Sequence, residues 1–394
     1  MLSKPALARM RQTMQRHVDG GEMPGLVYAV SRKGETIVET LGRQSVDGAP
    51  MREDSIFRIA SMSKPVLGVA ALMLVEECVL RLDDPVEPFL PELGQPAVLA
   101  SREAALDDVV AADRPINLRD LLTMRAGFGA VMEWSNPLPI QQAMDEAGVA
   151  PGPHPYTLGF DDFMQGLGSL PLVHQPGQGW MYQTGYDVLG VLLSRVLEKP
   201  LGTILKERIF DPLGMRDTGF FVPQDRLTRF ATQYGGGDAG LTVVDEAANG
   251  WYAGSPAFER AGAELVSTLP DYLTFCRLLL AGGTLDGVRL LSRPSVELMT
   301  MDHTTPEQKF GPDAAMFLGE AGGWGFQIGV NTKRTSAWTN PGRFGWDGGY
   351  GTSAWVDPKE GLVGILLTQR MMDAPQPQKH YLDFWTSAYA AVDD

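Results

Sequence analysis

The sequence predicts an α+β protein in which one antiparallel sheet, flanked by helices, is built from strands at the two ends of the chain. Two adjacent runs of strand character occur before residue 43, and further runs occur after residue 320. Helical patterns separated by proline- and glycine-rich loops occupy the middle of the chain. We therefore expect a second, helical domain and a cleft between the two parts, which is a common place for a ligand site.

The N-terminal segment has the pattern of a helix followed by a hairpin. Apolar side chains recur at helical spacing over residues 3–19. The runs 25–30 and 35–40 have strand composition, and the polar segment 31–34 separates them, which predicts a β-hairpin.

A fully apolar run leads into the middle of the chain. Every residue from 66 to 75 except Gly68 is apolar, a pattern that favours a helix buried on all sides. Helical patterns and loops then continue to about residue 240. We expect a helical domain over residues 83–240 and a discontinuous sheet domain formed by residues 1–82 and 241–394.

Strand patterns return in the last quarter of the chain, at 324–330, 344–346, 351–356 and 361–368. A terminal helix is expected from about residue 378 to residue 391. The early hairpin and these late strands are predicted to pair in one antiparallel sheet.

Charge and hydropathy exclude several classes of protein. Lysine and arginine number 33 against 48 aspartate and glutamate residues, which gives a formal net charge of −15. Such a surface repels phosphate backbones and anionic headgroups, so we expect no nucleic-acid partner. The first residues lack the apolar core of a signal peptide, and no apolar run reaches the roughly 18 residues that a membrane span needs. The expected location is the cytoplasm.

The cysteines and histidines suggest neither a disulfide framework nor a metal site. Cys78 and Cys276 lie in apolar runs of helical character, so we expect buried, reduced thiols and a reducing compartment. The five histidines show no spacing typical of metal ligands. We therefore expect no metal and no cofactor.

The first candidate for chemistry is a serine three residues before a lysine, Ser61-Met-Ser-Lys64, at the start of the apolar run. Residues three apart share one face of a helix. A serine hydroxyl becomes a good nucleophile when a base takes its proton, and burial lowers the pKa of a lysine enough for it to help. This spacing alone is a weak signal, because chance supplies about one such match in a chain of this length. The alternative is an N-cap serine beside a surface lysine.

Two later segments add to this candidate. Tyr182 follows a proline- and glycine-rich loop and precedes another apolar helix. A phenol beside a lysine ammonium ionises more readily, so Tyr182 is expected to relay the serine proton. Glycines inside the strand pattern of 344–351 indicate close approach of a ligand to the backbone, where a strand-edge N–H would complete an oxyanion hole.

These motifs together resemble the serine β-lactamase-related hydrolases, which include the class C β-lactamases and the D-amino-acid peptidases, and the nearest branch is the family VIII carboxylesterases. The resemblance extends from about residue 20 to about residue 370. It implies a β-lactamase/penicillin-binding-protein-like fold with the active site in the cleft between its two domains. The segments that carry it are Phe57–Val66, Ala71–Pro85, Ile116–Gly127, Pro176–Gly190 and Phe210–Phe220.

The resemblance also implies a role for individual residues. Ser61 would be the acylated nucleophile, and Lys64 and Tyr182 would move its proton. The backbone N–H groups of Ser61 and Gly349 would form the oxyanion hole. The substrate-binding residues would be Trp346, Gly348, Tyr350 and Thr184.

Two positions differ from the β-lactamase pattern. Where those enzymes have Lys-Thr-Gly, this chain has Trp346-Asp-Gly, and an indole cannot balance the carboxylate of a β-lactam or peptide. Arg343 is expected on the opposite face of the strand, so it does not replace the missing cation. Thr184 stands where an asparagine usually meets an amide-bearing acyl chain, and it offers a single hydroxyl. Both differences favour simple esters.

Three acidic residues lie near these motifs. Asp347 is expected to make a structural hydrogen bond, because strand alternation turns it away from the Trp346 side. Asp187 is expected to order the loop that carries Tyr182. Glu264 stands in a segment that is usually glycine-rich, and the sequence offers no explanation for it.

The sequence therefore predicts a serine carboxylesterase that hydrolyses short- to medium-chain carboxylic esters through an acyl-enzyme on Ser61. Its expected partner is a small-molecule ester. Three alternatives stay open: a β-lactamase or D-amino-acid amidase, an acyltransferase that passes the acyl group to an alcohol or amine, and a non-catalytic sensor that keeps a stable acyl adduct.

Overall fold

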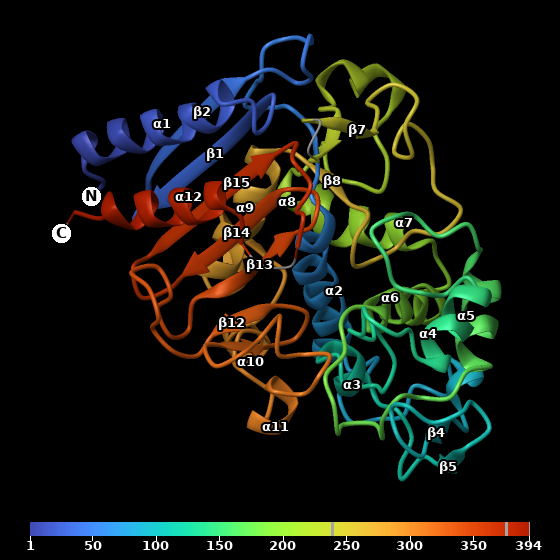
Figure 1. The fold of residues 1–394 in the computed structure, drawn as a ribbon. Coiled ribbons are helices and arrows are strands. Elements are labelled where there is room, and N and C mark those ends of the chain that lie inside the picture. Colours follow the sequence, from blue (N-terminus) through green and yellow to red (C-terminus); the bar gives the residue numbers. More distant parts are fainter. Residues whose placement is uncertain (238–239, 375–376, 394) are drawn as a thin grey trace.

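A computed structural model describes residues 1–237, 240–374 and 377–393, and its largest sheet has seven strands in these ranges (Figure 1). Their order across the sheet is β11-β12-β13-β14-β15-β1-β2, and every neighbouring pair is antiparallel. The expected pairing of the two ends of the chain is thereby confirmed. The strands are β1 (Gly25–Arg32), β2 (Glu35–Gly42), β11 (Gly322–Trp324), β12 (Gly329–Asn331), β13 (Phe344–Gly348), β14 (Thr352–Asp357) and β15 (Leu362–Thr368).

Strand β1 lies in the interior of the sheet and is buried on both faces. Its alternate residues Leu26, Tyr28 and Val30 pack in the cluster that includes helices α1 (Lys4–Asp19) and α12 (Lys379–Ala390). The residues between them belong to the larger core on the other side, which includes α9 (Leu269–Leu280). The period of two along the strand thus separates the two layers of helices.

Helix α2 (Lys64–Glu76) lies between the sheet and the helices of the middle segment (Figure 1). It follows the short 3₁₀ helix η1 (Ala60–Ser63), which contacts β13. Ten of its residues are buried, including every residue from Lys64 to Leu72. The predicted core helix is confirmed, and it places the Ser61–Lys64 pair between the two parts of the molecule.

The middle segment is mainly helical, as expected. Its helices are α3 (Leu118–Leu122), α4 (Pro139–Glu146), α5 (Phe160–Gly168), α6 (Thr184–Leu197), α7 (Leu201–Leu205) and α8 (Asp211–Leu213). The two-stranded sheet of β4 (Ala97–Leu99) and β5 (Val109–Ala111) also lies here, whereas the sheet of β6 (Gln233–Gly235) and β7 (Thr242–Asp245) extends past residue 240. The domain limits at residues 83 and 240 stay a prediction.

The remaining elements are short. They are β3 (Phe57–Arg58) paired with β8 (Val266–Ser267), β9 (Thr284–Leu285) paired with β10 (Val288–Arg289), the helices α10 (Arg293–Met299) and α11 (Pro306–Lys309), and the turns of helix η2 (Pro91–Leu93), η3 (Lys206–Phe210) and η4 (Gln224–Arg229).

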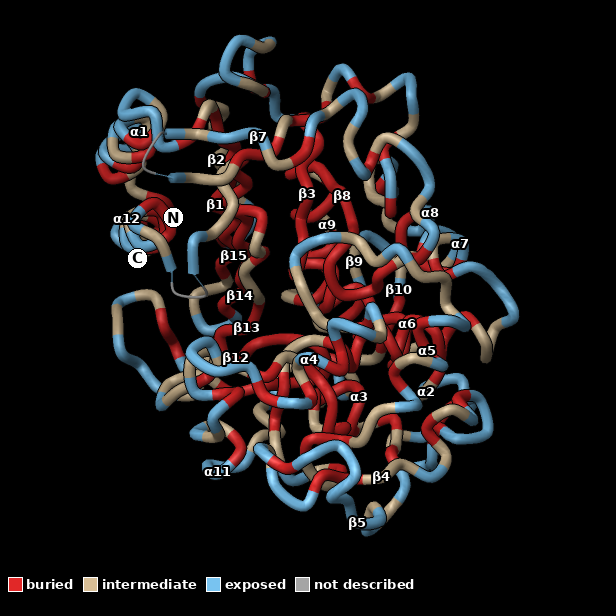
Figure 2. The backbone as a smooth tube through the Cα atoms, turned by 45° about the vertical axis from the view of Figure 1, so that its right-hand side comes forward, coloured by how far each residue is buried: buried red, intermediate tan, exposed pale blue. Residues whose placement is uncertain are grey.

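One hydrophobic core connects the sheet with the helical segment. The same cluster contains Val27 of β1, Leu67 of α2, Leu189 of α6 and Phe275 of α9. Figure 2 shows this continuity as buried backbone that extends from the sheet into the helices around α6. Relative motion of the two parts would therefore disrupt apolar packing.

The expected strand over 324–330 is wrong in one respect, because two short strands and a turn occupy this stretch. The N–H of Gly325 donates to the carbonyl of Ile328 at 2.8 Å, and Gln327 has a left-handed φ of 63°. The N–H of Gln327 donates to the carbonyl of Leu122, the last residue of α3. The turn is thus buried, so its composition resembles that of a strand.

The expectation of two buried thiols is correct for Cys276 and wrong for Cys78. Both cysteines are free, but Cys78 is exposed. Helix α2 ends at Glu76, and Cys78 adopts a left-handed φ of 58° in the turn that follows.

Among the described helices, none combines the length and the apolar character that crossing a bilayer requires.

Candidate active site

Ser61 lies in η1, at the junction between β3 and α2. The preceding strand is fixed by its pairing with β8, and the N–H of Ile59 donates to the carbonyl of Leu265 at 2.9 Å. Ala60 has a φ of 44°, in the left-handed region that a residue with a side chain rarely adopts. This strained turn directs Ser61 into a cavity of about 670 Å³.

Lys64 is three residues further on, and its side chain is fully buried. Its Nζ lies 2.5 Å from Oγ of Ser61 and 2.6 Å from the carbonyl oxygen of Gly262. The ring of Tyr186 lies 4.0 Å from the same nitrogen. Burial lowers the pKa of Lys64 well below its ordinary value, although the nearby Asp187 carboxylate acts in the opposite direction. The environment therefore favours a neutral amine, which can act as a base.

Tyr182 approaches Ser61 from the other side, at the end of the loop before α6. Its hydroxyl donates to Oγ of Ser61 at 2.9 Å and accepts a hydrogen bond from Nε1 of Trp346 at 2.7 Å. Burial raises the pKa of Tyr182, and these two hydrogen bonds only partly oppose it. The expectation that this phenol ionises more readily is therefore wrong, because the loss of hydration dominates.

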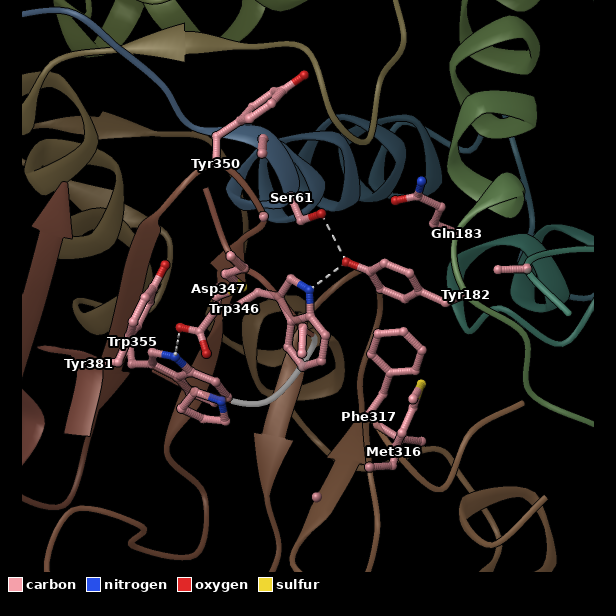
Figure 3. A pocket seen from close by; sticks show the side chains of 18 of the residues that line it. Ser61, Tyr182, Gln183, Met316, Phe317, Trp346, Asp347, Tyr350, Trp355 and Tyr381 are labelled. Atoms are coloured by element: carbon pink, nitrogen blue, oxygen red, sulfur yellow. Dashed lines mark hydrogen bonds between the residues drawn. The ribbon is translucent and has the colours of Figure 1, made fainter. Parts of the chain in front are cut away.

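Trp346, Tyr182, Ser61 and Lys64 form a chain of hydrogen-bonding groups. Figure 3 shows the part of it from Trp346 to Ser61. Indole has only an N–H to give, so Trp346 donates to Tyr182, and the phenol donates to Ser61. A charged Lys64 donates to Oγ of Ser61, and when its amine is neutral the serine hydroxyl can donate to it instead. That amine keeps an N–H for the carbonyl of Gly262. Each step orients the next one, so the serine proton points toward its acceptor.

The glycines after Trp346 bring β13 against η1. A Cβ on Gly348 would lie 2.4 Å from the carbonyl oxygen of Ile59, so only glycine permits this approach. Gly349 lines the cavity, and within the described ranges its N–H donates no hydrogen bond. Ser61 is in the first turn of η1, where N–H groups have no partner within the helix. Both amides are thus available to a ligand.

Not every expected substrate-binding residue lines the cavity. Trp346 and Tyr350 do, whereas Gly348 and Thr184 are absent from its lining. Thr184 is buried at the start of α6, and its hydroxyl has no hydrogen-bond partner in the described residues. The neighbouring Gln183 lines the cavity in its place.

The opposite wall of the cavity was missed by the sequence analysis. Phe317 stacks on Tyr182 with ring centroids 4.6 Å apart, and Met316 lies beside it (Figure 3). Both residues come from the segment between α11 and β11, which has no regular structure and no periodic pattern. The sequence carries no signal for this wall.

Arg343 and Asp347 both contact Trp355, away from the hydroxyl of Ser61. The guanidinium of Arg343 lies 4.4 Å from the ring of Trp355 and 4.1 Å from the ring of Trp385. Asp347 accepts hydrogen bonds from Ser353 and from Nε1 of Trp355 (Figure 3). The structural hydrogen bond expected for Asp347 is confirmed. Arg343 also lines the cavity, where its guanidinium lies over the rings of Trp355 and Trp385.

A buried charged cluster lies behind Lys64. Asp187 and Arg260 are both buried, with Oδ2 and Nη2 3.4 Å apart. Glu264, which the sequence left unexplained, accepts a hydrogen bond from the N–H of Arg260 at 3.3 Å. Burial raises the pKa of Glu264 to about 8. Arg260 was not predicted, because no local pattern shows that it would meet Asp187.

Known proteins match nearly the whole chain. The family model named Beta-lactamase matches residues 10–383. The protein Rv1367c of Mycobacterium tuberculosis is 38% identical over 366 residues, which cover 90% of this chain and 88% of that protein. The esterase EstB of Burkholderia gladioli is 29% identical, over 92% of this chain and 90% of its own.

A solved structure has the same fold. EstCE1, described as a hydrolase with promiscuous acyltransferase activity, superimposes with a TM-score of 0.79 at 24% sequence identity, and 98% of each chain is covered. The fold class is that of the serine β-lactamases and penicillin-binding proteins, as predicted. The family match and the esterase relative together support a serine hydrolase in the broad sense. The chain belongs to the β-lactamase family.

Proposed function

We propose that this protein is a serine carboxylesterase that hydrolyses short- to medium-chain carboxylic esters through an acyl-enzyme on Ser61. The observation that carries the proposal is the position of Oγ of Ser61, 2.5 Å from Nζ of Lys64 and 2.9 Å from the hydroxyl of Tyr182. This serine opens into a cavity of the size that small-molecule ligands occupy. The esterase EstB, which is similar to this protein along nearly the whole chain, supports the proposed esterase activity.

In the acylation step, Oγ of Ser61 attacks the ester carbonyl while the neutral amine of Lys64 accepts the serine proton. The carbonyl oxygen becomes an oxyanion, which accepts hydrogen bonds from the N–H groups of Ser61 and Gly349. When the C–O bond to the alcohol breaks, Lys64 and Tyr182 pass the proton to the leaving alkoxide. The products of this step are the free alcohol and an ester of Ser61.

In the deacylation step, a water molecule attacks the acyl-enzyme carbonyl and gives a proton to the same Lys64–Tyr182 pair. The second oxyanion uses the same two N–H groups. As the bond to Oγ breaks, the proton returns to Ser61, and the carboxylic acid leaves. If an alcohol takes the place of water, the same step yields a new ester, which is the acyltransferase alternative.

The cavity walls favour neutral acyl groups. Trp346 and Phe317 present apolar surface beside Ser61, where a β-lactamase has a lysine. A substrate carboxylate enclosed against these two rings would lose hydration that the rings cannot replace, at a cost of several kcal/mol. A neutral ester avoids this cost, so β-lactams and peptides with a free carboxylate are the poorer substrates.

The test is steady-state turnover of p-nitrophenyl esters of increasing acyl length, with nitrocefin in parallel, by the wild type and Ser61→Ala. We expect rapid ester turnover, slow nitrocefin turnover and no activity in the variant, whose circular dichroism should match the wild type. Retained ester turnover in Ser61→Ala would refute the assignment of the nucleophile.

Each alternative has its own signature in the same experiment. Dominant nitrocefin turnover would indicate a β-lactamase. Preferential formation of new esters when an acceptor alcohol is added would indicate an acyltransferase. A single stoichiometric burst without steady turnover would indicate an acyl-binding sensor.

A further inference from the structure

Residues 151–155, here called the proline loop, form part of the cavity wall. Its sequence is Pro-Gly-Pro-His-Pro, and the first three residues line the cavity. Three of its five residues lack a backbone N–H, so the loop cannot form a regular ladder of its own. Its carbonyl groups must find donors elsewhere in the protein.

Three side chains supply those donors. Nη1 of Arg260 donates to the carbonyl of Gly152 at 3.1 Å and to that of His154 at 2.6 Å. The hydroxyl of Tyr350 donates to the carbonyl of Pro153 at 2.6 Å. Nε2 of Gln183 adds a bond of 3.3 Å to the carbonyl of Gly152. The loop is thereby held at three successive carbonyls.

Each donor stands next to a group of the candidate active site in the sequence. Gln183 follows Tyr182, and Tyr350 follows Gly349. Arg260 precedes by two residues Gly262, whose carbonyl lies 2.6 Å from Nζ of Lys64. The donors that hold the cavity wall and the reacting groups therefore lie on the same short segments of backbone.

Arg260 has a second set of contacts, on the side of Lys64. Its guanidinium lies over the ring of Tyr156 at 4.0 Å and pairs with Asp187 at 3.4 Å. The positive charge of Arg260 and the negative charge of Asp187 act on Lys64 in opposite directions. Among the described residues, the other polar or titratable groups that face Lys64 or this pair are Ser61, Tyr182, Tyr186, Tyr252 and Glu264.

We propose that Arg260 is a positioning residue with two effects: it holds the proline loop against the cavity, which limits the size of the acyl group, and it offsets the charge of Asp187 behind Lys64. This inference rests on the proposed function. Burying an arginine costs free energy unless its charge is paired. Here one terminal nitrogen of the guanidinium contacts the proline loop, and the other pairs with Asp187. The same side chain thus links substrate selectivity to the state of the base.

The test measures kcat/KM for p-nitrophenyl acetate and p-nitrophenyl octanoate, across pH, in Arg260→Met. Release of the loop enlarges the cavity, so the octanoate-to-acetate ratio should rise at least about fivefold, the factor that corresponds to one of the two lost hydrogen bonds. Loss of the positive charge favours protonated Lys64, so the acidic limb of the pH profile should move to higher pH.

Three further variants separate the two effects. Tyr350→Phe loses one loop contact but no charge, so the ratio should rise while the acidic limb stays in place. Arg260→Lys keeps the charge but loses the two-carbonyl contact. The acidic limb of the pH profile should therefore return to its wild-type position, while the octanoate-to-acetate ratio stays raised. Arg277→Met removes an arginine that contacts Ser31 and Thr36 far from the cavity and should change neither.

An equal loss of kcat/KM for both esters in Arg260→Met, with no movement of the acidic limb, would overturn the proposal. If that variant fails to fold, Arg260→Lys and Tyr350→Phe still decide it, because unchanged ratios in both would refute the loop effect. Absence of ester turnover in the wild type would instead refute the proposed function. The movement of the acidic limb could then still be measured with nitrocefin.

Discussion

The indole of Trp346 acts on Ser61 through its hydrogen bond to Tyr182. Its N–H donates to the phenol oxygen at 2.7 Å, and its ring forms part of the cavity wall. Trp346→Phe keeps an aromatic wall but loses the donor that orients the Tyr182 hydroxyl. We expect kcat for short esters to fall about tenfold with little change in KM, because about 1.4 kcal/mol corresponds to that factor.

A matched control for that substitution exists nearby. Trp324 lies edge-on to Trp346, with ring centroids 4.7 Å apart, and its Nε1 has no hydrogen-bond partner in the described residues. Trp324→Phe therefore removes an indole without removing a hydrogen bond, and kcat should change far less. An unchanged kcat in Trp346→Phe would show that Tyr182 needs no partner.

Burial of the Lys64 amine lowers the stability of the folded protein, and the size of this effect depends on pH. Its pKa in the folded protein lies well below its ordinary value near 10.5. Between those two values the unfolded chain binds the proton and the folded chain does not, so this group's contribution to stability falls as pH falls. Lys64→Met removes the penalty together with the base. We expect a higher Tm than wild type, by a larger margin at pH 6 than at pH 9, and no ester turnover.

Thermal unfolding of both proteins by circular dichroism at the two pH values checks this prediction. Other titrating groups are common to the two proteins, so the difference in Tm isolates Lys64. An equal margin at both pH values would mean that the buried amine is not the source. A larger margin at pH 9 would reverse the direction assigned to its pKa.

The close contact between β13 and η1 requires a glycine at position 348. A Cβ at Gly348 would lie 2.2 Å from Oγ1 of Thr352 and 2.4 Å from the carbonyl oxygen of Ile59, whereas a Cβ at Gly349 would meet nothing within 4 Å. Gly348→Ala should cost about 1–3 kcal/mol of unfolding free energy, the usual penalty of overpacking. Gly349→Ala should leave stability nearly unchanged. Urea titration of both variants decides, and equal losses would contradict the tight contact.

Elements with an unbroken periodic pattern were predictable from sequence. The helix over 4–19, the hairpin over 25–42 and the core helix α2 all have the expected type, because burial on one or both faces fixes their patterns. The turn at 325–328 was not predictable. Its residues are buried against α3, so they are apolar for tertiary reasons, and only the backbone at Gln327 reveals the reversal.

The same distinction applies to the site. The places of Ser61, Lys64 and Tyr182 follow from short motifs at the ends of core helices, where local structure determines geometry. Arg260 and Phe317 lie in irregular segments, and their contacts depend on how distant parts of the chain pack. No residue pattern near either one encodes its partner. The sequence therefore predicted the groups at the serine hydroxyl better than the walls around them.

The shared core predicts one cooperative unfolding transition for the whole chain. Leu189 of α6 is fully buried in the same cluster as Val27 of β1. Leu189→Ala should cost about 2–5 kcal/mol, as buried leucine truncations do. Because the core is continuous, the variant should lower the midpoint seen by far-ultraviolet circular dichroism and the midpoint seen by near-ultraviolet circular dichroism equally. Two separated transitions would show that the helical segment folds independently.

The aromatic side chains around Tyr182 give the molecule an optical property. Trp346 at the cavity wall is edge-on to Trp324, whose ring lies 5.5 Å from that of Trp180 in the core. At such separations, the excitation energy of one indole transfers to its neighbours before it is emitted as fluorescence. A nitroaromatic leaving group seated against Trp346 would therefore quench the emission of the whole group. The protein thus carries a built-in fluorescent reporter of cavity occupancy, which needs no attached dye.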